Sequence, residues 1–476
     1  MATSYYFYDT ETTGTRPSGA RIMQFAGIRT DTDLNPIGEP DDILIKLPND
    51  VLPEPDAILV HGVTPQKANE DGITEAEFCR YFQDKIALPD TVFIGFNSVR
   101  FDDEFVRYTM YRNFYEPYEW QWKDGRSRWD LMDCLRMMRA LRPDGIEWPF
   151  GDDGRPTVKL TAMTAINGLD HENAHTAIAD VQATVDLARL AHTKQPKLFD
   201  YLLSIRGKRD VAKLVEASEP FVYTSGKYAS EHQKTTLVHM LLKHPKREAA
   251  IVYDLRVDPT PFFAMTVEEL AECWGRKYGE EGVRLPIKTL QYNRCPAIAP
   301  KAVLDGASQE RIGLNMAEVM EHLVLLQENK EFVGRLGQAL GILDDRQAAL
   351  QLDDAHVDTQ LYDSFWNDHD RVSLGLVREH SPATLGELLP HLQSKRMQKL
   401  LPLYKARNYP EFLTPEEHDA WEIYRQEKLL DGGNNSVYAR FMERLQALTK
   451  DRASDNDQFL LTELQLYAES IIPAID

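Results

Sequence analysis

The sequence predicts an α/β fold with a mixed sheet at its start, followed by a β-containing module and an α-helical C-terminal region. Strand-like apolar runs alternate with helical runs before residue 195, and beyond about residue 353 only acidic, helical runs remain. A chain of 476 residues is long enough for several domains of about 100–200 residues each. We therefore expect three domains, at 1–195, 196–350 and 351–476.

The first domain opens with three strand-like runs joined by short polar turns, which predicts an antiparallel start to the sheet. The strand-like runs lie at residues 4–8, 21–30, 42–47 and 91–97. The helical runs lie at residues 74–87, 101–113, 130–141 and 174–193. Because strands and helices then alternate, we expect a mixed sheet. Pro196 interrupts the pattern and supports a domain limit there.

The two following regions differ in composition. Residues 196–350 contain short strand-like runs at 220–225, 235–241 and 249–255, separated by Pro, His and charge clusters, and then helices from Asn315 onward. This predicts a small β-rich module. The last region holds amphipathic runs, such as those at 385–401 and 456–472, which are typical of packed helices.

The cysteine content excludes some kinds of site, whereas the net charge does not exclude a polyanionic ligand. The net charge is −21, but it is uneven: residues 1–196 carry −12, residues 197–311 carry +3 and residues 312–476 carry −12. Because charge acts locally, the total does not exclude a polyanionic ligand. Four scattered cysteines without CxxC spacing indicate neither a zinc site nor a disulfide framework. The chain has neither a secretory leader nor a membrane-spanning run, so we expect a cytoplasmic protein.

The sharpest local feature is the pair Asp9 and Glu11 at the end of the first strand. Side chains at positions i and i+2 of a strand share a face, so both carboxylates point to the same place. Carboxylate oxygens suit Mg²⁺, which leaves coordination positions open for a substrate phosphate. A D-x-E triplet also occurs by chance in a chain with 75 acidic residues, so this pair alone is weak evidence.

Three further residues extend this pattern. Asp102 is expected in the first turn of the helix after the fourth strand, although the helix dipole favours an acid there in any case and Asp103 fits equally well. His175 and Asp180 lie at the start of a later helix. Four acids in one cleft would repel each other unless metal neutralised them, so together they indicate two divalent ions. A neutral His beside them can accept a proton near pH 7.

This order of acids and histidine, with the motif DTETTG, resembles the His-containing branch of the DEDD exonuclease superfamily. Longer segments, among them RFDDEFVRYTMYRNFYEPYEWQW, INGLDHENAHTAIADV, NRCPAIAP and YKARNYP, resemble bacterial exonuclease I over nearly the whole chain. The resemblance implies a ribonuclease H-like exonuclease domain, an SH3-like domain and a helical C-terminal domain. It also implies processive 3′-to-5′ degradation of single-stranded DNA to 5′-mononucleotides, in DNA repair and recombination.

The resemblance assigns roles to the acids and the histidine. Asp9, Glu11, Asp102 and Asp180 match the metal ligands, for two Mg²⁺ ions with Mn²⁺ as a substitute, and His175 matches the general base. Lys159 stands where a substrate-contacting arginine is expected, and a lysine supplies the charge without the two-pronged contact of a guanidinium.

The segment from Arg100 to Arg142 predicts contacts with a single strand, because it interleaves nine basic residues with ten aromatic ones. Bases stack on aromatic rings while cations contact phosphates. Several of the aromatic residues, such as Phe105 and Phe114, are expected in the core instead, and each arginine could equally make an ordinary surface ion pair. The candidate substrate contacts are Lys159, Arg107, Arg112, Tyr118, Trp122, Arg128, Arg136 and Arg142, with Trp120 and Trp129 as further stacking candidates.

The resemblance also implies a monomer that binds the acidic C-terminal tail of single-stranded DNA-binding protein (SSB), and we assign Arg142 and Tyr201 to that pocket. Two other functions stay open. A ribonuclease could use the same four acids on RNA, because a pocket's shape and not its acids excludes a 2′-hydroxyl. A DNA-binding scaffold with an inert exonuclease domain is disfavoured by the complete set of acids and His175.

Overall fold

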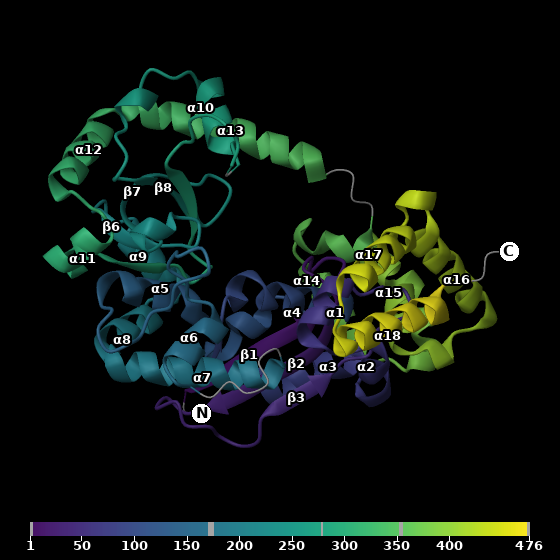
Figure 1. The fold of residues 1–476 in the computed structure, drawn as a ribbon. Helices are drawn as coiled ribbons and strands as arrows, with labels where there is room; N and C mark the ends of the chain where they lie inside the picture. Colours follow the sequence, from purple (N-terminus) through teal and green to yellow (C-terminus); the bar gives the residue numbers. More distant parts are fainter. Residues whose placement is uncertain (1–2, 170–175, 278, 352–355, 474–476) are drawn as a thin grey trace. The chain divides into compact units, whose positions relative to one another are not determined.

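The computed structural model describes residues 3–169, 176–277, 279–351 and 356–473, without the side chains of residues 348–351 (Figure 1). The chain divides into two compact units. The first comprises residues 1–127, 171–182 and 355–476, and the second comprises residues 128–170 and 183–354. Each unit is built around its own sheet.

The sheet of the first unit is mixed, as the sequence predicts. Its central strand β1 (Ser4–Thr12) pairs antiparallel with β2 (Ile22–Thr30) and parallel with β4 (Thr91–Gly95). The short β3 (Asp41–Leu44) pairs antiparallel with β2 and completes the predicted antiparallel start. Because β1 and β4 are parallel, their carboxyl ends meet at the same edge of the sheet.

Helices and an aromatic core cover this sheet. The helices are α1 (Pro55–His61), α2 (Pro65–Asp71), α3 (Glu75–Tyr81), which continues into a π-turn at Phe82–Ile86, and α4 (Asp102–Arg112). Phe82 packs edge-on against Phe25 and stacks on Phe93, and Phe82 and Phe93 both pack edge-on against Trp120, which is 0% exposed. The expectation of an exposed Trp120 is therefore wrong, because the core of the sheet takes its ring.

The second unit begins within β5 (Ser127–Asp130) and has a five-stranded antiparallel sheet in the order β10-β6-β7-β8-β9. Its strands are β6 (Phe221–Thr224), β7 (Thr235–Lys243), β8 (Ala249–Asp254), β9 (Ile287–Gln291) and β10 (Ala297–Pro300). This confirms the predicted β-containing module. Trp129 is also buried, against Phe199, which contradicts its predicted exposure.

The helices between residues 131 and 351 belong to the second unit, apart from the start of α7. They are α5 (Leu131–Leu141), α6 (Leu160–Ile166), α7 (Ala177–Lys194), α8 (Pro196–Ser204), α9 (Lys208–Val215), α10 (Val267–Gly275), α11 (Gly306–Arg311), α12 (Met316–Glu328) and α13 (Lys330–Gln351). The first turn of α7 belongs to the first unit. Pro196 occupies the first turn of α8, where its missing N–H costs nothing.

The C-terminal region is helical, as predicted. Its α-helices are α14 (Asp368–Glu379), α15 (Lys395–Asn408), α16 (Pro415–Leu430), α17 (Val437–Asp451) and α18 (Asp455–Ile471). The run at 385–401 is not one helix, because a 3₁₀ segment that includes Pro390 ends at His391 and α15 restarts after the cap at Ser394.

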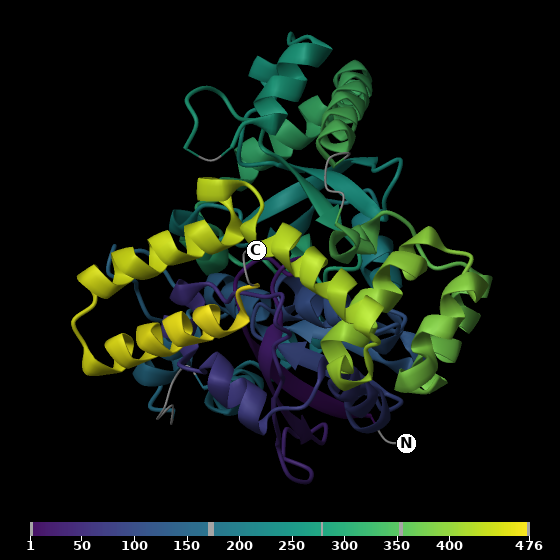
Figure 2. The ribbon, with the colours of Figure 1, turned by 90° about the vertical axis from the view of Figure 1, so that its right-hand side faces the viewer.

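The C-terminal helices pack directly on the N-terminal part of the first unit, residues 1–127. Figure 2 shows α17 and α18, in yellow, lying side by side. Their apolar residues form one core with α1, α2 and the β2 residue Met23. Within the described ranges, every helix is too short or too polar to cross a lipid bilayer.

Candidate active site

Three carboxylates meet at the end of β1. Asp9 and Glu11 project from the same face of this strand, and Asp180 lies in the first turn of α7. Carboxylate oxygens of these three residues lie within 4.8 Å of one another, and the side chains are partly exposed. This spacing allows one cation to contact all three, so the structure brings together three of the four predicted acids around a single point.

Asp102 lies at the carboxyl end of β4, where α4 begins, and is buried. It accepts hydrogen bonds from the backbone N–H and the hydroxyl of Thr10, at 3.0 and 2.5 Å. Thr10 lies between Asp9 and Glu11 in β1, so these bonds fix the Asp102 carboxylate beside the strand that carries the other acids. Asp103 points elsewhere and accepts a hydrogen bond from the buried Tyr8 hydroxyl. The structure thus distinguishes two acids that the sequence left equivalent.

Burial and the neighbouring acids destabilise the charged forms of Asp9 and Glu11. Burial, followed by repulsion from Asp102, Glu11 and Asp180, raises the pKa of Asp9 well above its ordinary value. The pKa of Glu11 is raised to about 8, mainly by burial and further by repulsion from the charges of Asp180 and Asp102. Burial also raises the pKa of Asp102, although the bonds from Thr10 oppose the increase. A divalent cation removes this repulsion, so the donor set fits a hard metal ion.

The predicted base, His175, lies outside the described residues, and its role stays a prediction. A different histidine, His61 at the end of α1, lies beside the site and was not predicted. Its Nδ1 accepts from the Val63 N–H at 3.0 Å, so Nε2 carries the hydrogen and donates to the Thr12 carbonyl at 3.3 Å. Burial lowers the pKa of His61 to about 4. This neutral side chain holds the loop after Glu11 and leaves the base role to another group.

Three predicted arginine contacts are contradicted by burial. Arg112 is 2% exposed and donates to Glu75 at 2.9 Å. Arg107 is buried and donates to Glu104 at 2.6 Å and to Gln121 at 2.8 Å. Arg128, in the second unit, is buried and donates to the Asn293 carbonyl at 2.7 Å. These guanidinium groups compensate internal oxygens, so they are not available to a phosphate.

The other predicted cations keep some exposed surface. Arg136 pairs with Asp133 at 2.6 Å, and Arg142 pairs with Asp305 at 3.2 Å and donates to the Val303 carbonyl at 2.8 Å. Lys159 is exposed immediately before α6. The pair of Arg142 with Asp305 is exposed and therefore weak, so a phosphate could compete with that carboxylate.

One of the two predicted stacking residues, Tyr118, belongs to a larger aromatic surface. Trp122 is 63% exposed, and Tyr118 is half-buried. The Tyr118 ring centroid lies 6.4 Å from that of Tyr362 and 5.7 Å from that of Phe365, which is 78% exposed. Sequence reasoning missed Tyr362 and Phe365, because they lie about 240 residues downstream in a helical region. The run DTQLYDSFW, with its three aromatic residues, is the sequence feature that could have drawn attention to them.

The two residues assigned to tail binding, Arg142 and Tyr201, lie in the second unit. Tyr201 is on α8, and its hydroxyl is buried without a hydrogen-bond partner among the described residues. Burial raises the pKa of Tyr201 to about 12. Arg142 follows α5. A hydroxyl that lacks a partner is a suitable donor to an incoming carboxylate or carbonyl.

Comparison with known proteins places this geometry in a family. Three family models match the chain: an exonuclease model over residues 6–188, the exonuclease I SH3-like domain over residues 206–341 and the exonuclease I C-terminal domain over residues 355–471. Exodeoxyribonuclease I of Haemophilus influenzae is 38% identical, with 98% of each chain covered.

Solved structures agree with this result. Escherichia coli exonuclease I in complex with a dA16 oligonucleotide is 36% identical, covers 99% of this chain and 100% of its own, and has a TM-score of 0.91. An SSB/exonuclease I structure with an inhibitor is 36% identical over the same shares of the two chains, with a TM-score of 0.88. The chain therefore belongs to the exonuclease I family of the DEDD exonuclease superfamily.

Proposed function

We propose that this chain is a 3′-to-5′ exodeoxyribonuclease that shortens single-stranded DNA and releases 5′-mononucleotides. The observation that carries the proposal is the convergence of Asp9, Glu11 and Asp180 within 4.8 Å, with Asp102 fixed beside them by Thr10. A relative with the same fold has been solved with a single-stranded oligonucleotide. The alternatives to this proposal are an exoribonuclease with the same acids and an inert DNA-binding scaffold.

The acids are suited to hold two Mg²⁺ ions, with Mn²⁺ as a substitute. Asp9 lies close to Glu11 and Asp180, and its charge also interacts with that of Asp102, so we assign Asp9 to both ions. When bound, such a pair of ions stabilises the attacking and leaving oxygens of a phosphodiester and lowers the pKa of water.

Protein residues assist the attack of water on the last phosphodiester. A water oxygen attacks the last phosphorus in line, the bond from phosphorus to the 3′ oxygen of the preceding nucleotide breaks, and the terminal nucleotide leaves with its 5′-phosphate. His175 accepts the proton of the attacking water, and Thr10 keeps Asp102 oriented throughout. His61 and Thr12 hold the loop next to Glu11 in place.

Aromatic and basic side chains are the candidate contacts for the strand. In the first unit, Tyr118, Trp122, Tyr362 and Phe365 offer stacking faces that do not discriminate between bases. In the second unit, the candidate phosphate contacts are Arg136, Arg142, Lys159, Arg206, Lys208, Arg209 and Lys213. Contacts along many nucleotides would retain the strand between cuts, which makes the enzyme processive.

We assign domains of this enzyme to residues 1–195, 196–350 and 351–476, and we place its monomeric form in the cytoplasm, in DNA repair and recombination. In repair and recombination, the proposed task of the enzyme is to remove a single strand one nucleotide at a time, with the four acids and their metals as the catalytic site.

Arg142 and Tyr201 form the proposed site for the acidic tail of SSB. Replacement of Arg142 by alanine is expected to weaken binding of a tail peptide at least tenfold, because a hydrogen bond to a charged group contributes about 1.5–3 kcal/mol. Fluorescence anisotropy of a labelled peptide measures this. Arg155→Ala removes an exposed arginine of the same unit and is expected to bind the peptide normally. Equal affinities for the two variants would show that the site is elsewhere.

The metal-free protein is expected to lose stability as the pH rises from about 5 to about 8. The pKa of Glu11 is about 8 in the folded protein, whereas it is about 4.3 in an unfolded chain. Between these values the folded state binds more protons, so the free energy of unfolding falls with increasing pH. Mg²⁺ replaces the proton, and it should therefore raise the melting temperature more at pH 8 than at pH 6.

Thermal unfolding with chelator and with Mg²⁺ across this pH range measures both effects. The Glu11→Gln variant, which cannot ionise at this position, is expected to show a smaller difference between the two pH values. An equal Mg²⁺ effect at pH 6 and pH 8 in the wild-type protein would contradict the charge repulsion described here.

The proposed function is tested by product release from matched single-stranded DNA, duplex DNA and single-stranded RNA, each labelled separately at its 5′ and 3′ ends. Shortening of single-stranded DNA alone, from its 3′ end and only with metal, is the expected result. Comparable degradation of RNA would favour the ribonuclease alternative. Binding of DNA without any release would favour the scaffold.

A further inference from the structure

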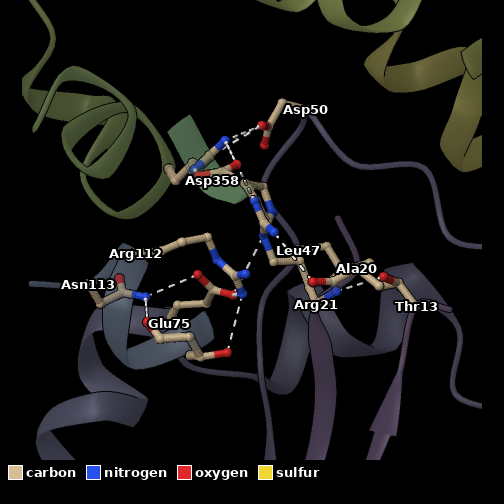
Figure 3. A network of polar contacts seen from close by, with 12 residues as sticks. Thr13, Ala20, Arg21, Leu47, Asp50, Glu75, Arg112, Asn113 and Asp358 are labelled. Carbon is tan, nitrogen blue, oxygen red and sulfur yellow. Dashed lines mark hydrogen bonds and ion pairs between the residues drawn. The ribbon is translucent and has the colours of Figure 1, made fainter. Parts of the chain in front are cut away.

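A buried network of charged residues joins the loop that follows Glu11 to the C-terminal helical region (Figure 3). We call it the charge network, and it consists of Arg21, Asp50, Glu75, Arg112, Asp358, Arg407 and Lys428. The first four residues come from the exonuclease part of the first unit, and the last three come from its C-terminal part. Because buried charges are costly unless they are paired, their presence here calls for a role.

Arg21 is the member of the network whose main chain contacts Thr13, in the loop after Glu11. It is 1% exposed, and its guanidinium lies 3.1 Å from the Asp358 carboxylate and 3.6 Å from that of Glu75. Asp358 is 337 residues away in the sequence, in the 3₁₀ segment Val357–Tyr362. The C-terminal region therefore holds the side chain of Arg21 in a single position.

The main chain of Arg21 holds Thr13, two residues after the metal-binding acid Glu11. The Thr13 N–H donates to the Arg21 carbonyl at 2.9 Å, and the Arg21 N–H donates to the Thr13 hydroxyl at 2.8 Å. The Glu54 N–H donates to the Thr13 carbonyl at 2.7 Å. Thr13 is thus fixed on both sides, and its position depends on where Arg21 and Glu54 lie.

A second branch of the network fixes the segment that contains Glu54. Arg407, on α15, donates to Asp358 at 2.7 and 2.9 Å and to Asp50 at 2.8 Å. Lys428, on α16, donates to Asp50 at 2.6 Å. Asp50 lies four residues before Glu54, so both supports of Thr13 are connected to C-terminal side chains.

We propose that Arg21 is a positioning residue, which acts with Asp358 to hold the Thr13 loop, and thereby Glu11, in the geometry that metal binding requires. The inference rests on the proposed function and deepens it, because it gives the C-terminal region a part in forming the metal site. Its physical basis is that a ligand misplaced by a fraction of an ångström loses much of its contribution.

Two conservative variants disturb this connection from its two ends. Arg21→Lys keeps the positive charge but cannot reach Asp358 and Glu75 together, and Asp358→Asn keeps the shape but removes the charge. For each, calorimetric titration with Mn²⁺ alone is expected to show affinity about tenfold weaker than in the wild-type protein. Affinity for single-stranded DNA in chelator is expected to stay within twofold of wild type, because the contacts along the strand are unchanged.

The matched control is Arg444→Gln. Arg444, on α17, forms a two-pronged ion pair with Asp56 of α1 at 2.6 and 2.8 Å, so it joins the same two parts of the unit, but at the surface and without contact to Thr13. Its Mn²⁺ affinity should match that of the wild-type protein. All titrations are made well below each variant's melting temperature, with folding checked by circular dichroism, and either network variant that folds is sufficient.

The outcomes separate this inference from the proposed function. Wild-type protein that binds no Mn²⁺ would overturn both. Normal Mn²⁺ affinity in a folded Arg21→Lys or Asp358→Asn variant would show that the network serves stability alone, and it would overturn the positioning role while leaving the nuclease proposal intact. Equal weakening in Arg444→Gln would also overturn it, because loss of any contact between the two parts would then suffice.

Discussion

Replacement of Asp9 by asparagine is expected to lower kcat on single-stranded DNA by at least about 10³-fold. Asp9 is the acid whose charge interacts with all three of the others. Asparagine keeps the shape and one oxygen but removes the charge that holds the metal ions, and metal ions contribute several kcal/mol to such reactions. Since about 1.4 kcal/mol corresponds to a tenfold change in rate, a loss of three orders of magnitude follows.

The same substitution is expected to raise the melting temperature of the metal-free protein at pH 8. Burial and the neighbouring acids destabilise the charged form of Asp9, and asparagine removes that cost. Affinity for single-stranded DNA should stay near the wild-type value, because the strand is held mainly away from the cut.

Single-turnover kinetics, thermal unfolding in chelator and anisotropy measure the three quantities. Asp33→Asn, which neutralises an exposed acid in the turn after β2, should leave all three unchanged. Retention of a tenth or more of the wild-type rate by Asp9→Asn would contradict the assignment of Asp9.

The second large effect is expected on stability, from Asp50→Asn. Asp50 is 0% exposed, and its carboxylate lies 2.8 Å from the Arg407 guanidinium and 2.6 Å from the Lys428 ammonium group. Removal of its charge leaves these two cations with fewer partners in the interior. Breaking a buried pair in this way costs about 3–5 kcal/mol, and we expect the free energy of unfolding to fall by that amount near pH 7.

The effect has a defined pH dependence. Burial alone would raise the pKa of Asp50, but Arg407, Lys428 and Arg21 hold it well below its ordinary value. A carboxyl whose pKa is depressed by folding stabilises the protein above its unfolded pKa, about 3.9, and loses that contribution as the pH falls. The difference between wild type and Asp50→Asn should therefore be full above about pH 5 and shrink in more acidic solution.

Urea unfolding at several pH values measures this difference. Asp56→Asn is the control, because Asp56 pairs with Arg444 at the surface, where water screens the interaction, and its loss should change stability little. Equal destabilisation by the two variants would show that burial of the network contributes nothing.

The sequence was most informative where the chemistry depends on local spacing. The i and i+2 positions of Asp9 and Glu11 place both acids on one face of any strand, and the order of strands and helices predicted the mixed sheet. The fourth acid was ambiguous, because Asp102 and Asp103 both suit a helix start, and only the bonds to Thr10 and Tyr8 distinguish them.

Predictions failed where the outcome depends on contacts between distant residues. Trp120 and Trp122 lie two positions apart among similar neighbours, yet the first fills the core and the second is exposed. Arg112 is indistinguishable from a surface cation until Glu75 is placed beside it. Likewise, no local pattern relates Arg21 to Asp358, whose contact spans 337 residues.

The central claim, that the four acids form a two-metal catalytic site, is tested most directly by anomalous X-ray diffraction from crystals grown with Mn²⁺ and a single strand with a non-hydrolysable 3′-terminal linkage. The account predicts two Mn²⁺ peaks in contact with Asp9, one shared with Glu11 and Asp180 and the other with Asp102, with the last phosphodiester between them. No peak at Asp9, or peaks only at other carboxylates, would contradict it.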